Sequence, residues 1–236
     1  MQRYQQQILV PQVLKGGQEK IGNAKVLIIG AGGLGVPLAT YLASAGVGHI
    51  GIVDQDTISI TNLHRQFLYT TADLNKNKVD ILKERLQQIN PEIQITAYCE
   101  KLDENNASEL IENYGILCDC TDDTETRILI GATSAALHKP LVYAAVLEWT
   151  AYLTVLNHKQ GITLEDIFSS QAMRENTLNT CNNSGIINTT CGTAATMQAS
   201  EVLKIILDLE SNLDGRLLCM DTLNNIFKSF KIQKSC

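Results

Sequence analysis

A short glycine-rich segment constrains this chain more than any other feature. The hexapeptide GAGGLG at Gly30–Gly35 matches the pattern GxGxxG and follows an apolar, β-branched run at Lys25–Gly30. The residues after it, Pro37–Gly46, read as a helix with Pro in its first turn and Gly at its end. A strand, a glycine turn and a helix in this order bring free N–H groups and the positive end of a helix dipole together. The segment therefore predicts an anion site at Gly30, Gly32, Gly33 and Gly35.

An acidic residue follows at the distance that a nucleotide site needs. Asp54 ends a second strand-like run, His49–Asp54, 19 residues after Gly35. A carboxylate there can accept hydrogen bonds from ribose hydroxyl groups. The alternative is a glycine-rich turn that binds nothing. The motif also leaves the nucleotide open, because NAD and ATP both suit it.

Strand and helix patterns alternate along the first 146 residues, which predicts a parallel sheet with right-handed crossovers. The second half differs: a strand at 150–157 follows without a helix between, a helix is expected at 194–209, and 216–232 reads as a hairpin. We expect an α/β fold with a Rossmann-like, mostly parallel sheet flanked by helices and extended by antiparallel C-terminal strands. One domain, 1–236, would include a helical arm at 1–24 and a mobile crossover loop at 158–183. Five expected strands lie at 25–30, 49–54, 93–99, 115–120 and 141–146, and four helices at 37–46, 76–90, 103–113 and 125–137.

Composition excludes several classes of protein. The formal charge of −6 gives no electrostatic footprint for nucleic acid or an anionic membrane. No apolar run approaches the roughly 18 residues of a membrane span, and the first residues lack a signal-peptide pattern, so we expect a soluble, cytoplasmic protein. The seven cysteines include no CxxC pair, so neither a disulfide framework nor structural zinc is expected.

A longer motif overlaps the second strand. Residues Asp54–Gln66 read DxDxIxxxNLxRQ, which resembles the ThiF/MoeB/HesA family of ubiquitin-activating-enzyme-like adenylyltransferases, and ThiF most of all. The resemblance extends from Arg3 to about Phe230. It is also carried by RYxxQI at Arg3–Ile8, GQEK at Gly17–Lys20, AGVG at Ala45–Gly48, NPEI at Asn90–Ile93, DCTDD at Asp119–Asp123 and QASEVLKII at Gln198–Ile206.

The resemblance implies a single ATP-binding domain that uses Mg2+-ATP to adenylylate the C-terminal Gly-Gly tail of a ubiquitin-like sulfur carrier. Arg65 and Lys78 would hold the polyphosphate, Asp122 would hold Mg2+, and Asp54 would bind the ribose. Asn62 and Gln66 would bond to the phosphates or to the tail. The implied nucleotide-binding set is the four glycines with Asp54, Asp56, Asn62, Arg65, Gln66 and Lys78, and the implied catalytic set is Arg65, Lys78, Asp122 and Cys181.

Each side chain also has a local explanation. Lys78 could be a solvated helix residue, and Arg65 could form a surface ion pair worth under about 1 kcal/mol. Asp122 could cap the following helix, while Asp54 and Asp56 could cap a turn. Only the joint pattern favours the functional reading.

The chain departs from the family pattern in three ways. Gln6 stands where the family has a second arginine in RYxRQI, which reaches the partner subunit's ATP phosphates. Two zinc-binding CxxC pairs found in many members are missing. Asp123 replaces the asparagine of CTDN and could tighten Mg2+ binding or cap a helix.

Cys181 occupies a position resembling the crossover-loop cysteine of ThiF-like members, which is thought to form an acyl disulfide with the carrier thiocarboxylate. An incidental loop cysteine is an equal alternative, because a related branch of the family does without it, and the reactivity of the thiol depends on its pKa. Cys191, near the start of an apolar helix, is expected to be buried.

Several functions remain open from the sequence. The first is adenylylation of a ThiS-like carrier for thiazole (thiamine) biosynthesis, and the nearest rival acts on a MoaD-like carrier in molybdopterin synthesis. A tRNA-modification cyclase, an NAD-dependent oxidoreductase and a non-adenylating carrier-binding scaffold are further alternatives. The resemblance implies a homodimer, and sulfur would come from a separate donor protein.

Overall fold

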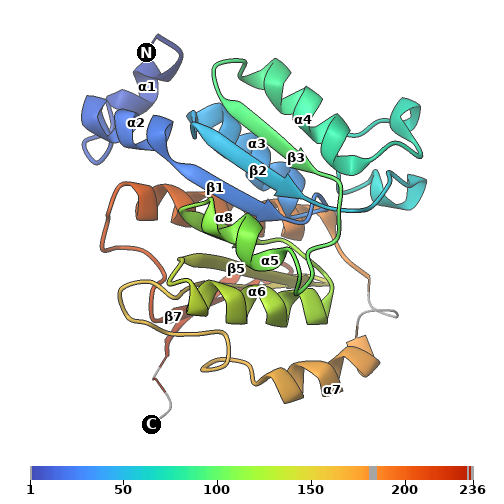
Figure 1. The fold of residues 1–236 in the computed structure, drawn as a ribbon. Coiled ribbons are helices and arrows are strands. Elements are labelled where there is room, and N and C mark those ends of the chain that lie inside the picture. The colour runs from blue at the N-terminus through green and yellow to red at the C-terminus, as the bar shows by residue number, and fades with distance from the viewer. Residues whose placement is uncertain (1, 181–184, 233, 235–236) are drawn as a thin grey trace.

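The computed structural model describes residues 2–180, 185–232 and 234. Within them, eight strands form one sheet in the order β3-β2-β1-β4-β5-β6-β7-β8 (Figure 1). Neighbouring strands from β3 to β5 run parallel, and those from β5 to β8 run antiparallel. The expected fold class is confirmed. The strands are β1 Lys25–Ile29, β2 His49–Val53, β3 Gln94–Tyr98, β4 Ile116–Asp119, β5 Leu141–Leu147, β6 Thr150–Leu156, β7 Arg216–Asp221 and β8 Ile226–Lys231.

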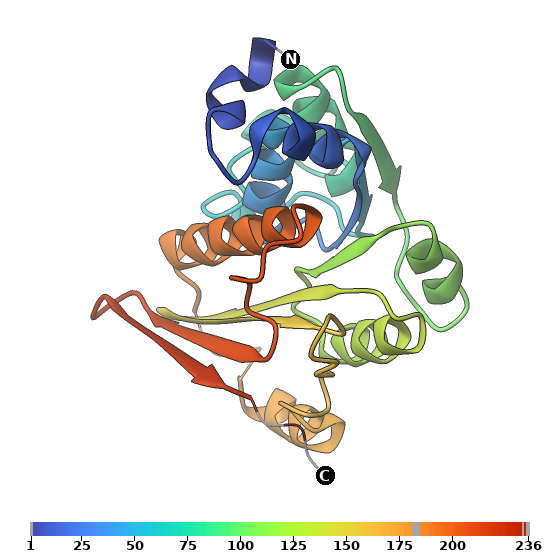
Figure 2. The same ribbon diagram turned by 90° about the vertical axis from the view of Figure 1, so that its left-hand side faces the viewer.

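Helices cover both faces of the parallel strands (Figures 1 and 2). On one face lie α3 (Gly35–Ala45), α4 (Lys78–Ile89) and α8 (Asn188–Ile206). On the other lie α5 (Ala107–Glu112), α6 (Thr124–Ala136) and α7 (Ser170–Thr180). The remaining helical segments are η1 (Gln2–Tyr4), α1 (Gln5–Ile8), α2 (Leu14–Asn23), η2 (Ile60–Asn62) and η3 (Thr71–Asp73).

The central strand shows why an unbroken apolar run suits this position. Along β1, Val26 and Ile28 join the core beneath α3, α4 and α8, while Leu27 and Ile29 join the core beneath α5 and α6. Successive side chains of a strand point to opposite faces, so a strand covered on both sides needs apolar residues throughout.

Two expectations about the second half need correction. The polar stretch 158–183 was expected to be a loop, but it contains helix α7, Ser170–Thr180. Helix α8 begins at Asn188, six residues before the expected Ala194, because its first turn is built from polar and small residues that lack apolar spacing. In the described part of the chain, no helix combines the length and apolar character needed to cross a membrane.

Candidate active site

The predicted site residues gather where the strand order changes direction. From β1 the chain proceeds to β2 on one side, and β4 pairs with β1 on its other side. The carboxyl ends of β1, β2 and β4 are followed by Gly30, Asp54 and Cys120 respectively. Ligands of open α/β sheets bind in the crevice at such a switch point.

The glycine loop follows a path that only glycine allows at two positions. Gly30 has φ 104°, and a Cβ on it would lie 2.6 Å from the carbonyl oxygen of Cys120. A Cβ on Gly35 would overlap the Gly30 carbonyl oxygen. Positive φ and close backbone approach are both costly for other residues. The loop therefore folds tightly between β1 and α3.

Asp54 holds this loop in place. Its Oδ2 accepts a hydrogen bond from the Ala31 N–H at 2.7 Å, and its Oδ1 accepts from the Asp56 N–H at 2.8 Å. Burial raises the pKa of Asp54, and the charge of Lys78 opposes that rise. Each carboxylate oxygen has a second lone pair, so Asp54 can still accept a hydrogen bond from a ligand.

Arg65 lies over the glycine loop. A Cβ on Gly33 would lie 3.1 Å from Arg65 Cδ, and Arg65 Nη2 donates to Asn62 Oδ1 at 3.2 Å. Its Nη1 contacts the Thr61 carbonyl oxygen and the His64 ring. Among the residues that the structure describes, no carboxylate pairs with this guanidinium. Its charge is therefore available to an anion at the loop.

Gln66 is the next residue and is only 2% exposed. Its Nε2 would lie 3.6 Å from a Cβ on Gly32, so it faces the same loop. Its Oε1 is buried and has no hydrogen-bond partner within the described residues. A buried unpaired acceptor costs about 1–3 kcal/mol, so this amide is suited to receive a donor from a ligand.

Lys78 is a buried cation rather than a solvated helix residue. It is 4% exposed, begins α4, and its Nζ lies 2.6 Å from Asp56 Oδ2. The same ammonium acts electrostatically on Asp54. A buried lysine is rare without a partner, and here its partner, Asp56, is itself exposed.

The two aspartates after β4 have different roles. Asp123 caps α6, because its Oδ2 accepts from the Thr126 N–H at 2.8 Å and from the Thr126 hydroxyl at 2.6 Å. The Thr126 hydroxyl bond is the main cause of a lowered pKa at Asp123. Asp122 is exposed and makes no hydrogen bond within the described part of the chain. The cap suggested for Asp122 is therefore supplied by its neighbour.

The donor set could hold a magnesium ion only if substrate phosphates and water completed its coordination. No group of three or more His, Cys, Asp or Glu residues surrounds a possible metal position among the described residues. Magnesium usually takes one or two carboxylates together with substrate phosphates and water. Asp122 fits that requirement, since it is exposed at the carboxyl edge of the sheet.

A buried ion pair beneath Asp122 was missed by the sequence analysis. Arg127 Nε donates to Asp119 Oδ2 at 2.9 Å, and Arg127 Nη2 donates to the Thr121 carbonyl oxygen. The guanidinium also lies over the Tyr143 ring, 5.1 Å from its centroid. Burial raises the pKa of Asp119, with Arg127 opposing the rise. The one available signal was a charged residue inside the apolar run ILCDC.

A small pocket opens beside Arg65. It has a volume of about 110 Å³ and connects the glycine loop with the start of α8. Its walls include Gly33, Pro37, His64, Arg65, Phe67, Asn188, Thr189 and Gly192. The site is therefore open to a ligand between α3 and α8.

Two residues of the N-terminal arm are not brought to this site. Arg3 donates to the Ile89 carbonyl oxygen at the far end of α4, and Gln6 is exposed on the same arm. Cys181 lies outside the described residues. Cys191 is buried as expected but lies against the glycine loop, since a Cβ on Gly33 would lie 3.3 Å from its Sγ. Burial raises its pKa to about 11, which keeps it a thiol at neutral pH.

The chain was compared with known proteins. The profile of the ThiF family matches residues 4–236. The adenylyltransferase and sulfurtransferase MOCS3 of Culex quinquefasciatus is 39% identical over 231 residues, which are 98% of this chain and 52% of that protein. The sulfur carrier protein adenylyltransferase of Thermus thermophilus is 33% identical over 240 residues, which cover 100% of this chain and 88% of that protein.

Solved structures show the same fold. Escherichia coli MccB with ATP superposes with a TM-score of 0.82 at 23% identity, covering 93% of this chain and 66% of that one. This chain spans about half the length of the MOCS3 relative. The match over almost every residue establishes that the chain belongs to the ThiF family.

Proposed function

We propose that this protein uses ATP to adenylylate the C-terminal glycine carboxylate of a ubiquitin-like sulfur carrier, releasing pyrophosphate. The observation that carries the proposal is that Arg65 and Gln66 lie against the glycine loop, while buried Lys78 acts electrostatically on Asp54, which is bonded to that loop. An NAD-dependent oxidoreductase would need the loop and Asp54 but has no use for these side chains. Binding a polyphosphate and neutralising its charge would use all three of these side chains.

The reaction is mainly a problem of position and charge. A carboxylate oxygen of the carrier tail forms a bond to the α-phosphorus, and the bond from that phosphorus to the bridging oxygen of the β-phosphate breaks. The leaving pyrophosphate carries the electron pair of the broken bond. Arg65 and Lys78 would stabilise the charge that accumulates on the phosphates, and the loop N–H groups would orient them. Gln66 Oε1 would accept a hydrogen bond from the incoming tail amide.

Binding ATP would rearrange one ion pair. Lys78 is held by Asp56 at 2.6 Å, and Asp56 is exposed. A phosphate near Lys78 would compete with Asp56, which can turn into solvent. Mg2+ would be bound by Asp122 and by the phosphates, and it would neutralise part of their charge when present.

The carrier is proposed to be ThiS-like, serving thiazole synthesis. Cys181 supports this choice, because it resembles a cysteine that ThiF-like members use with the thiocarboxylate of the carrier. A MoaD-like carrier is the alternative, and the relative from Thermus thermophilus is named only for a sulfur carrier. A separate donor protein would supply the sulfur, and two copies of the chain would form a homodimer.

An uncovered apolar surface supports a protein as the second substrate. Leu147, Tyr152, Ile226 and Phe230 are all exposed. The strand register places them on one face of β5–β8, beyond the cover of α6 and α7. Exposed apolar patches are one mark of protein interaction sites.

A carrier-binding scaffold without adenylylation is the second candidate function. It is favoured by Gln6, a neutral amide where the family has an arginine that reaches the partner's phosphates. An amide cannot replace the charge of a guanidinium. The two candidates differ in one measurable property, the turnover of ATP with carrier present.

The test is ATP–pyrophosphate exchange with purified ThiS-like and MoaD-like carriers, each with and without its terminal glycine. Exchange with one intact carrier would establish adenylylation and identify that carrier. Lys78→Met should lower the exchange rate at least about 100-fold, the typical effect of removing a group that stabilises transition-state charge. Lys83→Met changes a lysine in the same helix that lines neither the loop nor the pocket, and should leave exchange unchanged.

The scaffold is supported if ATP binds but neither carrier supports exchange. Equal losses in Lys78→Met and Lys83→Met would show that the phosphate role assigned to Lys78 is wrong. Thermal unfolding of both variants separates either result from a folding defect.

A further inference from the structure

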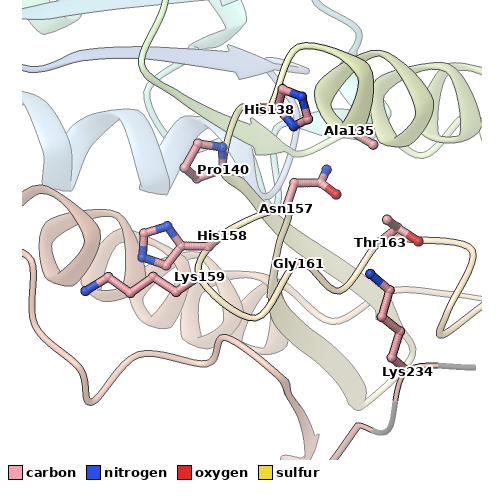
Figure 3. A pocket seen from close by; sticks show the side chains of 9 residues that line it. All are labelled: Ala135, His138, Pro140, Asn157, His158, Lys159, Gly161, Thr163 and Lys234. Carbon is pink, nitrogen blue, oxygen red and sulfur yellow. The ribbon is translucent and has the colours of Figure 1, made fainter.

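A second pocket lies at the opposite edge of the sheet from the candidate active site. It has a volume of about 550 Å³ and is bounded by the end of α6, the start of β5, the turn after β6 and the C-terminal segment (Figure 3). The active-site loops follow the carboxyl ends of β1, β2 and β4, whereas this pocket lies at the amino end of parallel strand β5. Its lining residues are Ala135, His138, Pro140, Asn157, His158, Lys159, Gly161, Thr163 and Lys234.

The lining is rich in basic side chains in a protein of formal charge −6. Two of the four histidines and two lysines line the pocket, and no aspartate or glutamate does. Lys159 is already paired, since its Nζ lies 2.7 Å from Asp208 Oδ1. His138 and Lys234 have neither an ion pair nor a side-chain hydrogen bond within the described residues. Their charge capacity is therefore unused by the fold.

A third group in the lining, the His158 ring, lacks a hydrogen-bond partner. The Nε2 atom of His158 is buried and has no hydrogen-bond partner in the described part of the chain. Figure 3 shows His158 beside Pro140, with Lys234 directing its ammonium toward the side that carries Asn157 and Thr163. A buried ring nitrogen without a partner is costly, and an anionic oxygen would satisfy it.

The turn that forms this pocket is held firmly. Asn157 has φ 54°, and its Nδ2 donates to Ser134 Oγ at 2.8 Å. Its backbone N–H donates to the Ile162 carbonyl oxygen at 2.7 Å, which closes the turn. Thr163 donates both its N–H and its hydroxyl to Asp166. His158 is therefore carried by a preorganised turn, His138 follows the end of α6, and Lys234 comes from the C-terminal segment after β8.

We propose that this pocket binds a small organic phosphate through His138, His158 and Lys234. A phosphomonoester carries a charge of −1.5 to −2 at pH 7 and three acceptor oxygens, which matches three donors on different walls. The volume lies within the range of about 300–1,000 Å³ typical for small-molecule pockets and exceeds the need of a bare phosphate. Ala135, Pro140 and Gly161 provide the apolar wall for the organic part. A metal ion fits poorly, because two imidazoles without a carboxylate or thiolate make an incomplete ligand set.

The test uses the full chain and ribose 5-phosphate, with ribose as the matched neutral probe. The four histidines give four imidazole signals by proton NMR, each assigned from a single His→Gln variant. We expect ribose 5-phosphate to shift the signals of His138 and His158 in a saturable way, and ribose to shift neither. His49 lies outside both pockets and should not respond. His64 lies beside Arg65 at the glycine loop, so a shift of His64 without shifts of His138 and His158 would place the phosphate there and overturn the proposal.

Variants locate the binding further. The double variant His138→Gln/Lys234→Gln should weaken binding at least about tenfold, as expected for two lost charge-assisted contacts. Lys139→Gln is the control, since it removes a neighbouring charge whose Nζ binds the Glu112 carbonyl oxygen instead of lining the pocket. The proposal is overturned if His138 and His158 show no saturable shift, if ribose acts equally, or if the double variant binds as well as the control.

Discussion

At the scale of single residues, the ion pair of Arg127 and Asp119 places a charged carboxylate in the interior, where burial disfavours the charge. Asp119 is buried and the Arg127 side chain is 14% exposed beneath the turn that presents Asp122, and Gln198 holds the same turn by donating to the Asp119 carbonyl oxygen at 3.0 Å. Burial raises the pKa of Asp119 and favours its neutral form, and the Arg127 guanidinium opposes this most strongly, followed by the hydrogen bond from the Thr121 N–H. The charge of one residue therefore depends on its partner.

Removing Arg127 should leave Asp119 as an uncompensated buried charge. We expect Arg127→Met to lower the free energy of unfolding at pH 7 by about 3–5 kcal/mol, measured by urea denaturation. Because the folded pKa of Asp119 would then lie further above its unfolded value, the deficit should grow as pH rises from about 4. Asp119→Asn/Arg127→Met should recover part of the loss.

The control for this prediction is Arg174→Met, which breaks an exposed ion pair with Glu125 at 2.8 Å. Its cost should stay below about 1 kcal/mol, as for other surface pairs. Equal costs in the two single variants would contradict the role given to the buried pair.

The stabilisation from Asp73 is expected to depend on pH in the opposite direction to the effect of Asp119 in Arg127→Met. Its carboxylate accepts from the Thr70 hydroxyl at 2.7 Å, from the Thr70 N–H, and from Lys76 and Arg85. The Thr70 hydroxyl bond is the main cause of a pKa lowered to about 2. The folded pKa is below the unfolded value, so the stabilisation is present above about pH 4 and is lost as pH falls toward 2.

Asp73→Asn should therefore lower the free energy of unfolding at pH 7 by about 2 kcal/mol, the typical value for a hydrogen-bonded charge. The difference from the unsubstituted protein should shrink between pH 4 and pH 2, followed by thermal unfolding. A difference that is constant across this range would show that the carboxylate charge contributes nothing.

At the scale of elements, the glycine loop was predictable from the sequence, but the distant side chains that hold it in place were not. The hexapeptide, the strand before it and the helix after it are all local patterns, and periodicity detects such patterns well. The loop is also held by Asp54 and by Tyr69, whose hydroxyl donates to the Ala31 carbonyl oxygen at 3.0 Å. Tyr69 lies 38 residues from Ala31, and no local pattern indicates a contact over that distance.

The same limit explains the elements that were missed. Helix α7 lacks an apolar stripe of its own, with Met173 packed against the smaller core, so its sequence resembles a loop. Arg127 lies in an expected helix, but its partner Asp119 comes from a strand, and the pair forms only when both elements pack. Lys78 was predicted as a site residue only through the family resemblance, because no local pattern distinguishes it from a solvated helix residue, and its partner Asp56 lies 22 residues away.

A substitution in the loop tests how tightly this element is built. Gly35→Ala would force a methyl group into the Gly30 carbonyl oxygen and should lower the melting temperature by several degrees while abolishing ATP binding. Gly16→Ala, in helix α2 with open space around its Cα, should stabilise the protein by up to about 1 kcal/mol. ATP binding by calorimetry and thermal unfolding would be measured on both, and unchanged binding in Gly35→Ala would contradict the placement of the site.

At the scale of the whole molecule, the N-terminal arm lies at the wrong end to serve its own site. Tyr4 packs against Gly46 at the last turn of α3, whereas the glycine loop lies at the first turn of the same helix. Eleven residues of helix separate the two by roughly 16 Å. Gln6 could therefore act only on the site of another copy.

This arrangement predicts the effect of restoring the family residue. In the proposed homodimer, Gln6→Arg should raise the rate of ATP–pyrophosphate exchange about tenfold or more by adding a phosphate-binding charge in trans. Arg introduced at the neighbouring Gln5 should have no such effect. An unchanged rate in Gln6→Arg, with the dimer verified by light scattering, would show that the missing arginine is not limiting.

The order of strands has a consequence for synthesis on the ribosome. Strand β1 lies between β2 and β4, and its residue Ile29 pairs with Asp119, about 90 positions further along the chain. At roughly 5–20 residues per second, β4 emerges roughly 5–20 s after β1. Through that interval the nascent protein carries an apolar strand with one open edge, the kind of edge that pairs with other chains. The step most exposed to aggregation is therefore translation itself, before the nucleotide loop between β1 and α3 has its backing from β4.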